Sequence, residues 1–206
     1  MLFSDTYKTP ASPAQAELRE RGSKFLAFVF PVANEQEIKQ HLLDLRKEFP
    51  DATHHCYAWK LGMDDAHQRA NDDGEPANTA GRPILRAIQS AGITNVLVVV
   101  VRYFGGKLLG VPGLIQAYGE AASAALKNTS FIVKEICSFY HLIYPFESEG
   151  DAFRFLKQQQ ATIQQQTLSE TGEAQLLFSI RLSKAEELMN GVKDYHKLKI
   201  HYLYTV

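Results

Sequence analysis

The sequence has few cysteines, no long apolar run and almost no net charge. Its only cysteines are Cys56 and Cys137, too few for a disulfide framework or a cysteine-rich zinc site. No apolar run approaches the roughly 20 residues that a membrane helix needs. The first residues, MLFSDTYKTP, lack the basic region and apolar core of a secretory signal. We therefore expect a cytoplasmic protein that does not associate with membranes.

The charge balance excludes a basic nucleic-acid-binding domain. The 206 residues include 22 basic and 23 acidic side chains, for a net charge of −1. Any contact with nucleic acid must therefore come from a local patch of basic residues and not from the charge of the whole chain.

The stretch from Gly81 to Gly113 organises the rest of the chain. Its middle, Asn95 to Val101, is almost entirely β-branched and apolar, which favours a strand buried on both faces. The strand runs directly into Arg102, a glycine-rich turn and a helix that we expect from about Leu114 to Lys127. Backbone N–H groups and cations at such a strand end often hold anions.

The pattern of elements predicts an α+β protein of two domains, 1–132 and 133–206. In the first, the spacing of apolar residues from Asn34 to Glu48 predicts an amphipathic helix, with Asn34 and Glu37 in an arrangement close to a capping box. From Asn128 onward the order of elements reads β-α-β-β-α-β, the ferredoxin-like pattern.

A pair of histidines and a cysteine, His54, His55 and Cys56, lies at the start of a predicted strand. Because neighbouring residues on a strand point to opposite faces, at most one of the histidines can serve a given site. The simpler alternative is one surface histidine and one buried cysteine. Zinc is not expected, because no further ligands follow at suitable spacing.

An acidic loop follows at Asp72, Asp73, Gly74 and Glu75. Clustered carboxylates bind Mg²⁺ or act as general acid and base. The same residues are also turn formers, and the later ligands of an EF-hand loop are missing. We favour the turn, with no metal and no cofactor.

Two further turns offer positive charge. Thr79 and Gly81 precede Arg82 at the start of a predicted helix, a place that either attracts an anion or simply caps the helix. The second turn begins with Arg102. Arginine can fork onto phosphate and aromatic rings can stack on bases; alternatively, Arg102 pairs internally with Asp72 or Asp73 and the aromatics belong to the core. The candidate anion- or nucleic-acid-binding residues are Arg82, Arg102, Tyr103, Phe104, Gly105, Gly106, Lys107 and Gly110.

Three linked motifs, HHCYAW, NDDGEPANTAGRPIL and VVVVRYFGGKLLG, resemble the YigZ/IMPACT family. The resemblance implies an N-terminal domain with the α/β fold of elongation factor G domain IV, a fold also found in a small-subunit ribosomal protein. It implies a ferredoxin-like C-terminal domain similar to elongation factor G domain V. The polar residues shared with the family fall on His54, Asp72, Asp73, Gly74, Glu75, Thr79, Gly81, Arg102, Gly105, Gly106 and Gly110, with His55 beside them.

Three functions remain open, of which the resemblance suggests the first. The family's eukaryotic members regulate translation, in part through a domain that this chain lacks, so the first hypothesis is a translation-associated protein that binds RNA or the ribosome. The second is an enzyme acting on a phosphorylated or nucleotide substrate, for which no complete catalytic constellation is visible. The third is an adaptor with a protein partner, docking through the ferredoxin-like sheet.

Overall fold

The computed structural model describes residues 5–63, 66–168 and 172–206, which form two compact units. The first unit is Tyr7–Lys134. The second comprises Glu135–Val206 together with Asp5 and Thr6. In the described ranges, no helix is both long and apolar enough to cross a membrane. The protein is thus a mixed α/β chain with separate antiparallel sheets in its two parts.

The first part of the chain contains most of the residues singled out above. Its elements are β1 (Thr6–Pro10), β2 (Ala14–Glu20), β3 (Ser23–Pro31), α1 (Glu35–Glu48), β4 (His54–Lys60), β5 (Gln68–Asn71), α2 (Gly81–Ala91), β6 (Val96–Tyr103), α3 (Gly110–Lys127) and β7 (Phe131–Glu135). Strands β1 and β7 pair with each other, and the other strands form one sheet in the order β2-β3-β6-β4-β5.

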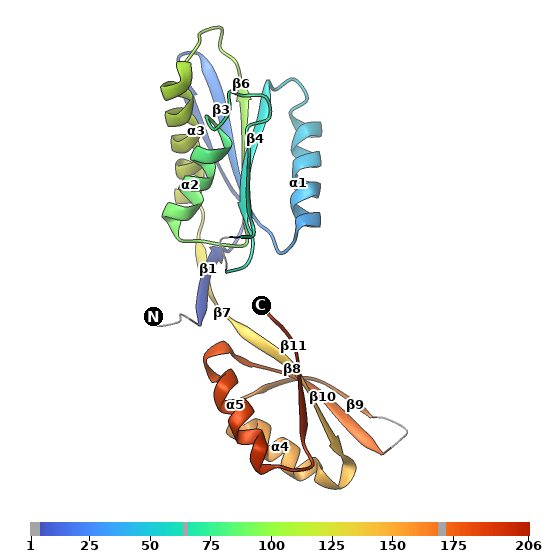
Figure 1. Ribbon diagram of the computed structural model, residues 1–206. Helices are drawn as coiled ribbons and strands as arrows, with labels where there is room; N and C mark the ends of the chain where they lie inside the picture. The colour runs from blue at the N-terminus through green and yellow to red at the C-terminus, as the bar shows by residue number, and fades with distance from the viewer. Residues whose placement is uncertain (1–4, 64–65, 169–171) are drawn as a thin grey trace. The chain divides into compact units, whose positions relative to one another are not determined.

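Strand β6 is the centre of that sheet and pairs antiparallel with β3 and β4. Alternate residues beginning with Val96 pack against α2 and α3, while those beginning with Leu97 pack against α1. Figure 1 shows α1 on one face of the sheet and α2 and α3 on the other. The prediction of a strand buried on both faces is confirmed, because both faces carry helices.

Local signals explain where the helices begin. Asn34 is the N-cap of α1 as predicted: its Oδ1 accepts from the N–H of Glu37 at 2.9 Å, and Glu37 Oε2 accepts from the N–H of Ala33 at 2.8 Å. Helix α3 begins at Gly110, four residues before the predicted Leu114. Pro112 fits into its first turn because the N–H that proline lacks has no partner there.

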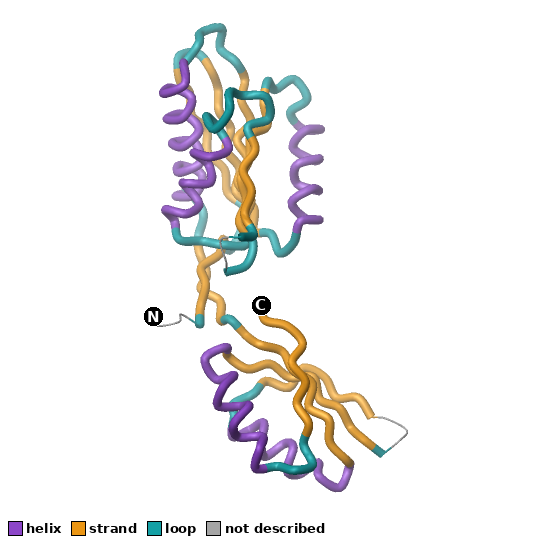
Figure 2. Tube along the Cα trace, in the orientation of Figure 1, coloured by secondary structure: helices purple, strands orange, loops and turns teal. Residues whose placement is uncertain are grey.

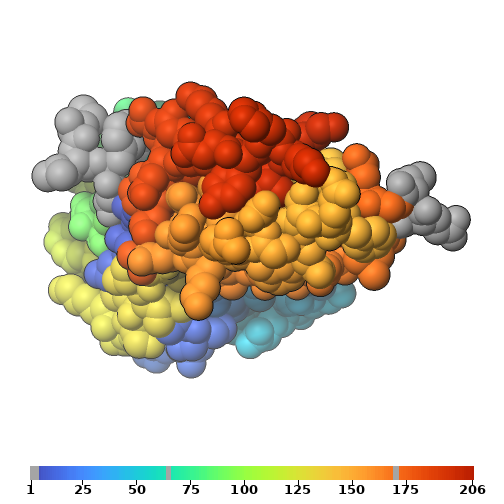
Figure 3. Space-filling view, turned by 90° about the horizontal axis from the view of Figure 1, so that it is seen from below, coloured from blue at the N-terminus to red at the C-terminus, as the bar shows by residue number. Residues whose placement is uncertain are grey.

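The second unit contains β8 (Cys137–Pro145), α4 (Glu149–Gln158), β9 (Thr162–Leu168), β10 (Glu173–Arg181), α5 (Ala185–Gly191) and β11 (Lys199–Thr205), with short 3₁₀ turns at Phe146–Ser148, Leu182–Lys184 and Val192–Asp194. The sheet order is β11-β8-β10-β9, and each neighbouring pair is antiparallel. The predicted β-α-β-β-α-β order is therefore confirmed. Helices α4 and α5 lie side by side on one face of the sheet (Figure 1, Figure 3), where Phe155 and Leu188 pack against the strands.

Loops that carry the motif residues gather at one end of the first sheet (Figure 2). They are the acidic loop 72–80 between β5 and α2, and the loop 104–109 between β6 and α3, which we call the glycine loop. The glycine loop contacts the start of β3, because Gly105 N donates to Ser23 Oγ at 3.1 Å. Residues far apart in the sequence are thereby brought together.

Candidate functional site

Asp72 caps helix α2. Its Oδ1 accepts from the N–H groups of Ala80 at 3.0 Å and Gly81 at 2.8 Å, and its Oδ2 accepts from that of Asn78 at 2.8 Å. The side chain of Thr79 instead donates to the carbonyl of Pro76 at 2.7 Å. The sequence allows two interpretations of this helix start, an external anion or a cap. The carboxylate of Asp72 occupies the position that an external anion would take. Capping is the alternative that the structure supports.

Asp73 points away from Asp72 and toward helix α1. Its Oδ1 accepts from Arg46 Nη2 and its Oδ2 from the N–H of His55, each at 2.7 Å. Its φ of 42° lies in the left-handed region that aspartate tolerates in turns. The carboxylates of the acidic loop therefore serve separate partners, and the described residues contain no group of three histidine, cysteine or acidic side chains that could hold a metal ion.

Glu75 turns inward and is buried with Arg102. Arg102 Nη1 donates to Glu75 Oε1 at 2.5 Å, and the two side chains are 6% and 4% exposed. Tyr118 of α3 donates to the same oxygen at 2.7 Å. The expectation that Arg102 pairs internally is right in kind, but the predicted partners, Asp72 and Asp73, are wrong. Those two carboxylates already accept from backbone N–H groups, whereas Glu75 faces the end of β6.

Burial also fixes the protonation of the neighbours of Glu75. Burial is the main cause that raises the pKa of the Tyr118 hydroxyl well above its ordinary range, so Tyr118 stays a donor. Burial likewise raises the pKa of the Cys56 thiol, which donates to the carbonyl of Asp72 at 3.0 Å and contacts the hydroxyl of Tyr118 at 3.3 Å. A protonated, buried thiol is a poor nucleophile.

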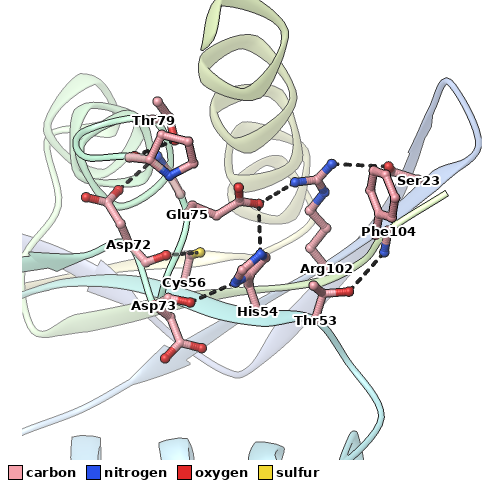
Figure 4. Close-up of polar contacts among 12 residues, drawn as sticks. Ser23, Thr53, His54, Cys56, Asp72, Asp73, Glu75, Thr79, Arg102 and Phe104 are labelled. Atoms are coloured by element: carbon pink, nitrogen blue, oxygen red, sulfur yellow. Dashed lines mark hydrogen bonds and ion pairs between the residues drawn. The ribbon is translucent and has the colours of Figure 1, made fainter. Parts of the chain in front are cut away.

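His54 and His55 point to opposite faces of β4, as the alternation of a strand predicts. His54 lies on the side of the acidic loop, with Nδ1 2.8 Å from the carbonyl oxygen of Asp73 and Nε2 3.8 Å from Glu75 Oε1 (Figure 4). His55 is buried on the α1 side, and burial lowers its pKa, with the charge of Arg46 as the next cause. The alternative is right for Cys56, which is buried, but neither histidine lies fully on the surface: His54 is partly covered by the acidic loop, with 19% of its side chain exposed, and His55 is covered by α1.

The glycine loop is held in place by contacts with neighbouring segments of the first sheet. Gly105 has no room for a side chain, since a Cβ there would lie 1.9 Å from the backbone carbon of Gly22. Ser23 Oγ accepts from Arg102 Nη2 at 3.4 Å, and Thr53 Oγ1 accepts from the N–H of Phe104 at 3.1 Å (Figure 4). The loop is thus anchored to β3 and to the segment before β4.

The remaining predicted binding residues differ in how far they are exposed to solvent. Phe104 is 47% exposed, so it is not a core residue, whereas Tyr103 is half-buried and packs against the α1 side of the sheet. The other four residues, Arg82, Gly106, Lys107 and Gly110, are exposed. Arg102 itself is inside the unit and does not present its charge at the surface.

A pocket of about 360 Å³ opens above this cluster. Its floor carries the partly exposed His54 and the buried Glu75 and Arg102. Its rim is apolar, with Leu108 85% exposed. The full lining is Thr53, His54, Glu75, Pro76, Arg102, Phe104, Leu108, Leu109, Gly110, Val111 and Leu114. The pocket therefore combines residues from all three sequence motifs with Thr53, Val111 and Leu114, which lie outside them.

Sequence reasoning missed three polar partners in this cluster: Ser23, Thr53 and Tyr118. Tyr118 had a usable signal, because it shares the apolar face of a predicted helix with Leu114 and a buried tyrosine hydroxyl needs a hydrogen-bond partner. Ser23 and Thr53 carry no local signal, since each acts only through a contact with the distant glycine loop.

Comparison with known proteins agrees with the motifs. Residues 21–126 match the family model of the Impact N-terminal domain. The chain is 31% identical over 208 residues to the IMPACT family member YvyE of Bacillus subtilis, covering 98% of this chain and 95% of YvyE. It is 38% identical over 126 residues to the IMPACT family member YigZ of Escherichia coli, covering 60% of this chain and 62% of YigZ.

A eukaryotic relative and one solved structure extend the likeness. Protein IMPACT of Mus musculus is 35% identical over 132 residues, covering 62% of this chain and 41% of that protein. A crystal structure of a hypothetical protein is similar over 98% of this chain and 99% of that chain, with a TM-score of 0.73 and 28% identity. With the family domain matched over half of the chain and a relative aligned over nearly all of it, this protein belongs to the IMPACT family.

Proposed function

We propose that this protein is a translation-associated regulator that binds RNA or the ribosome through its glycine loop. Membership of the IMPACT family supports the link to translation, because the family's eukaryotic members regulate it. The predicted likeness of the two domains to domains IV and V of elongation factor G points in the same direction, as an analogy of fold only.

One observation carries the proposal: an exposed aromatic ring and an exposed lysine share a short, anchored loop. Phe104 is 47% exposed, and Lys107 lies three residues further on the same loop. Exposed aromatic rings stack on unpaired bases and lysines contact phosphates, which is how proteins hold single-stranded nucleic acid. Because the net charge of the chain is −1, such a local site is the form that RNA binding has to take.

Arg102, which the sequence suggests as a phosphate-binding residue, has a structural role in this proposal. Its guanidinium is paired with Glu75 inside the unit, so it positions the glycine loop and does not contact phosphate. Lys107, and Arg82 at the start of α2, are the exposed cations of the predicted set.

The test is cosedimentation with ribosomes and with single-stranded RNA over a salt series. The variant Phe104→Ala/Lys107→Ala is compared with Phe146→Ala/Lys127→Ala, which removes an aromatic ring of similar exposure (45%) and an exposed lysine elsewhere. We expect binding to weaken with salt and to be lost in the first variant alone. Lys107→Ala by itself should reduce the slope of log K against log salt by about 0.7, the value for one phosphate on a single strand. Wild-type protein that binds neither ribosomes nor RNA at low salt contradicts the proposal.

A second candidate is an enzyme acting on a nucleotide or another phosphorylated substrate. The pocket favours it, because a histidine and a carboxylate meet at its floor, with Nε2 of His54 3.8 Å from Oε1 of Glu75. Such a pair can move a proton. Hydrolysis of nucleotides by wild type and not by His54→Ala would support this function.

A further inference from the structure

The pocket floor presents hydrogen-bond acceptors without matching donors. Nδ1 of His54 lies 2.8 Å from the carbonyl oxygen of Asp73. Because a carbonyl only accepts, Nδ1 carries the proton, and in the neutral ring Nε2 is then an acceptor. In that form, Nε2 and Glu75 Oε1 are two acceptors 3.8 Å apart.

Only one of the two oxygens of the Glu75 carboxylate accepts hydrogen bonds from the described residues. Its Oε1 accepts from Arg102 and from Tyr118, whereas its Oε2 has no hydrogen-bond partner among the described residues. Arg102 donates through Nη1 to Glu75 and through Nη2 to Ser23, and its buried Nε–H has no hydrogen-bond partner among the described residues. A ligand that pairs with these acceptors must therefore carry at least two hydrogen-bond donors.

The electrostatics and the rim restrict the ligand further. The charge of Arg102 offsets that of Glu75, so no unpaired negative charge is left to attract a cationic ligand, which Arg102 would repel. A neutral donor group is therefore favoured. The rim is apolar and includes the exposed ring of Phe104. A flat, neutral group that stacks on an aromatic ring and donates from its edge meets both conditions.

We propose that the pocket binds a single unstacked guanine base of an RNA strand held by the glycine loop. Guanine presents two neighbouring donors, N1–H and N2–H₂, next to the carbonyl O6. The donors suit Glu75 and His54, and O6 suits the positive charge of Arg102. Uracil has one ring N–H donor between two carbonyls, and adenine and cytosine place an acceptor beside their single amine. The pocket volume of about 360 Å³ is ample for one base. This assignment rests on the proposed RNA binding and adds base specificity to it.

The experiment varies the RNA, which leaves the protein unchanged. Fluorescence anisotropy is measured for U-heptamers whose central nucleotide is uridine, guanosine, inosine, adenosine, cytidine or abasic. We expect the guanosine heptamer to bind about tenfold more tightly than the abasic one, as for a base held by two hydrogen bonds. Inosine, which lacks the N2 amine, should lie between the two.

Protein variants test whether the preference comes from this pocket. Phe104→Ala and His54→Ala should abolish the difference between guanosine and abasic heptamers, with folding checked by circular dichroism. Phe146→Ala, with a similarly exposed ring, should keep it.

The outcomes separate the two proposals. Equal, salt-dependent binding of all heptamers, weakened by Lys107→Ala, overturns the guanine pocket and leaves the RNA-binding function standing. A preference for adenine or cytosine overturns the guanine assignment. If no heptamer binds and ribosomes do not bind either, both proposals are wrong.

Discussion

Arg102 and Glu75 form a buried ion pair that joins the end of the central strand to the acidic loop. Nη1 of Arg102 lies 2.5 Å from Oε1 of Glu75, although the residues are 27 positions apart in the sequence. The pair fixes the floor of the pocket and, through Ser23, the base of the glycine loop. The family's two most prominent motifs thus meet in one structural contact.

Breaking this pair should destabilise the first unit strongly. Glu75→Gln leaves the charge of Arg102 buried without a counterion, so we expect the free energy of unfolding to fall by about 3–5 kcal/mol. Tyr118→Phe removes one hydrogen bond to the carboxylate and should cost about 1–3 kcal/mol. Urea unfolding followed by Trp59, the single tryptophan of the chain, measures both.

The control for these variants is an exposed ion pair. Glu17 contacts Arg19 at 2.8 Å on the surface of β2, and Glu17→Gln should change the free energy of unfolding far less than Glu75→Gln, because solvent screens an exposed pair. Equal effects of Glu75→Gln and Glu17→Gln would contradict the importance of the buried pair.

Gly105 and Gly106 should respond very differently to alanine. A Cβ at Gly105 would overlap the backbone of Gly22, whereas no atom lies within 4 Å of a Cβ at Gly106, whose φ is +80°. Gly106→Ala should cost about 1–2 kcal/mol, the strain of the left-handed conformation, and Gly105→Ala considerably more. Thermal unfolding of the two variants gives the comparison, and a similar loss in both would argue against the tight contact at Gly22.

Asp72 should stabilise helix α2 as its cap. Asp72→Ala removes the acceptor of three backbone N–H groups, and we expect a loss of about 1–2 kcal/mol. Asp44→Ala serves as the control, because Asp44 is exposed and accepts only from Gln40 within α1. If the wild-type protein bound a divalent cation more tightly than Asp72→Ala does, Asp72 would instead be a metal ligand.

Stability should fall at acid pH in part through His55. Burial and then the charge of Arg46 lower its pKa below the ordinary value of 6.5, so the folded protein keeps His55 neutral where the unfolded chain takes up a proton. Its contribution is complete above pH 6.5 and is lost as the pH falls toward the lowered pKa of the folded state. Urea midpoints at pH 7.5 and 5.5 should therefore differ more in wild type than in His55→Leu. The same difference in both proteins would show that other groups cause it.

The two cysteines should differ in reactivity. Cys56 is fully buried and its pKa is raised by burial, whereas Cys137 is partly exposed and its pKa is raised too. At pH 8 we expect iodoacetamide to modify Cys137 slowly and Cys56 only after urea unfolds the protein. Mass spectrometry of the digested protein identifies the modified residue. Early modification of Cys56 would show that the cluster around Tyr118 opens readily.

The elements with a strong local signal could be predicted from the sequence. The apolar run in β6 and the Asn34–Glu37 cap of α1 depend on neighbouring residues, and both predictions are confirmed. Helix α3 begins four residues before the predicted Leu114, because its first turn contains Gly110, Pro112 and Gly113, residue types that are also typical of a turn. The division into domains 1–132 and 133–206 stays a prediction.

The sequence by itself determined the family, the buried strand and the order of elements in the second part, because these follow from patterns among nearby residues. Only the tertiary structure decided what each carboxylate of the acidic loop does. Asp72, Asp73 and Glu75 are nearly adjacent, yet one caps a helix, one contacts Arg46 and one is buried with Arg102. The physical reason is that a carboxylate's role depends on the donor that it meets, and here the decisive donors lie on α1, α2 and β6, which only folding brings to the acidic loop.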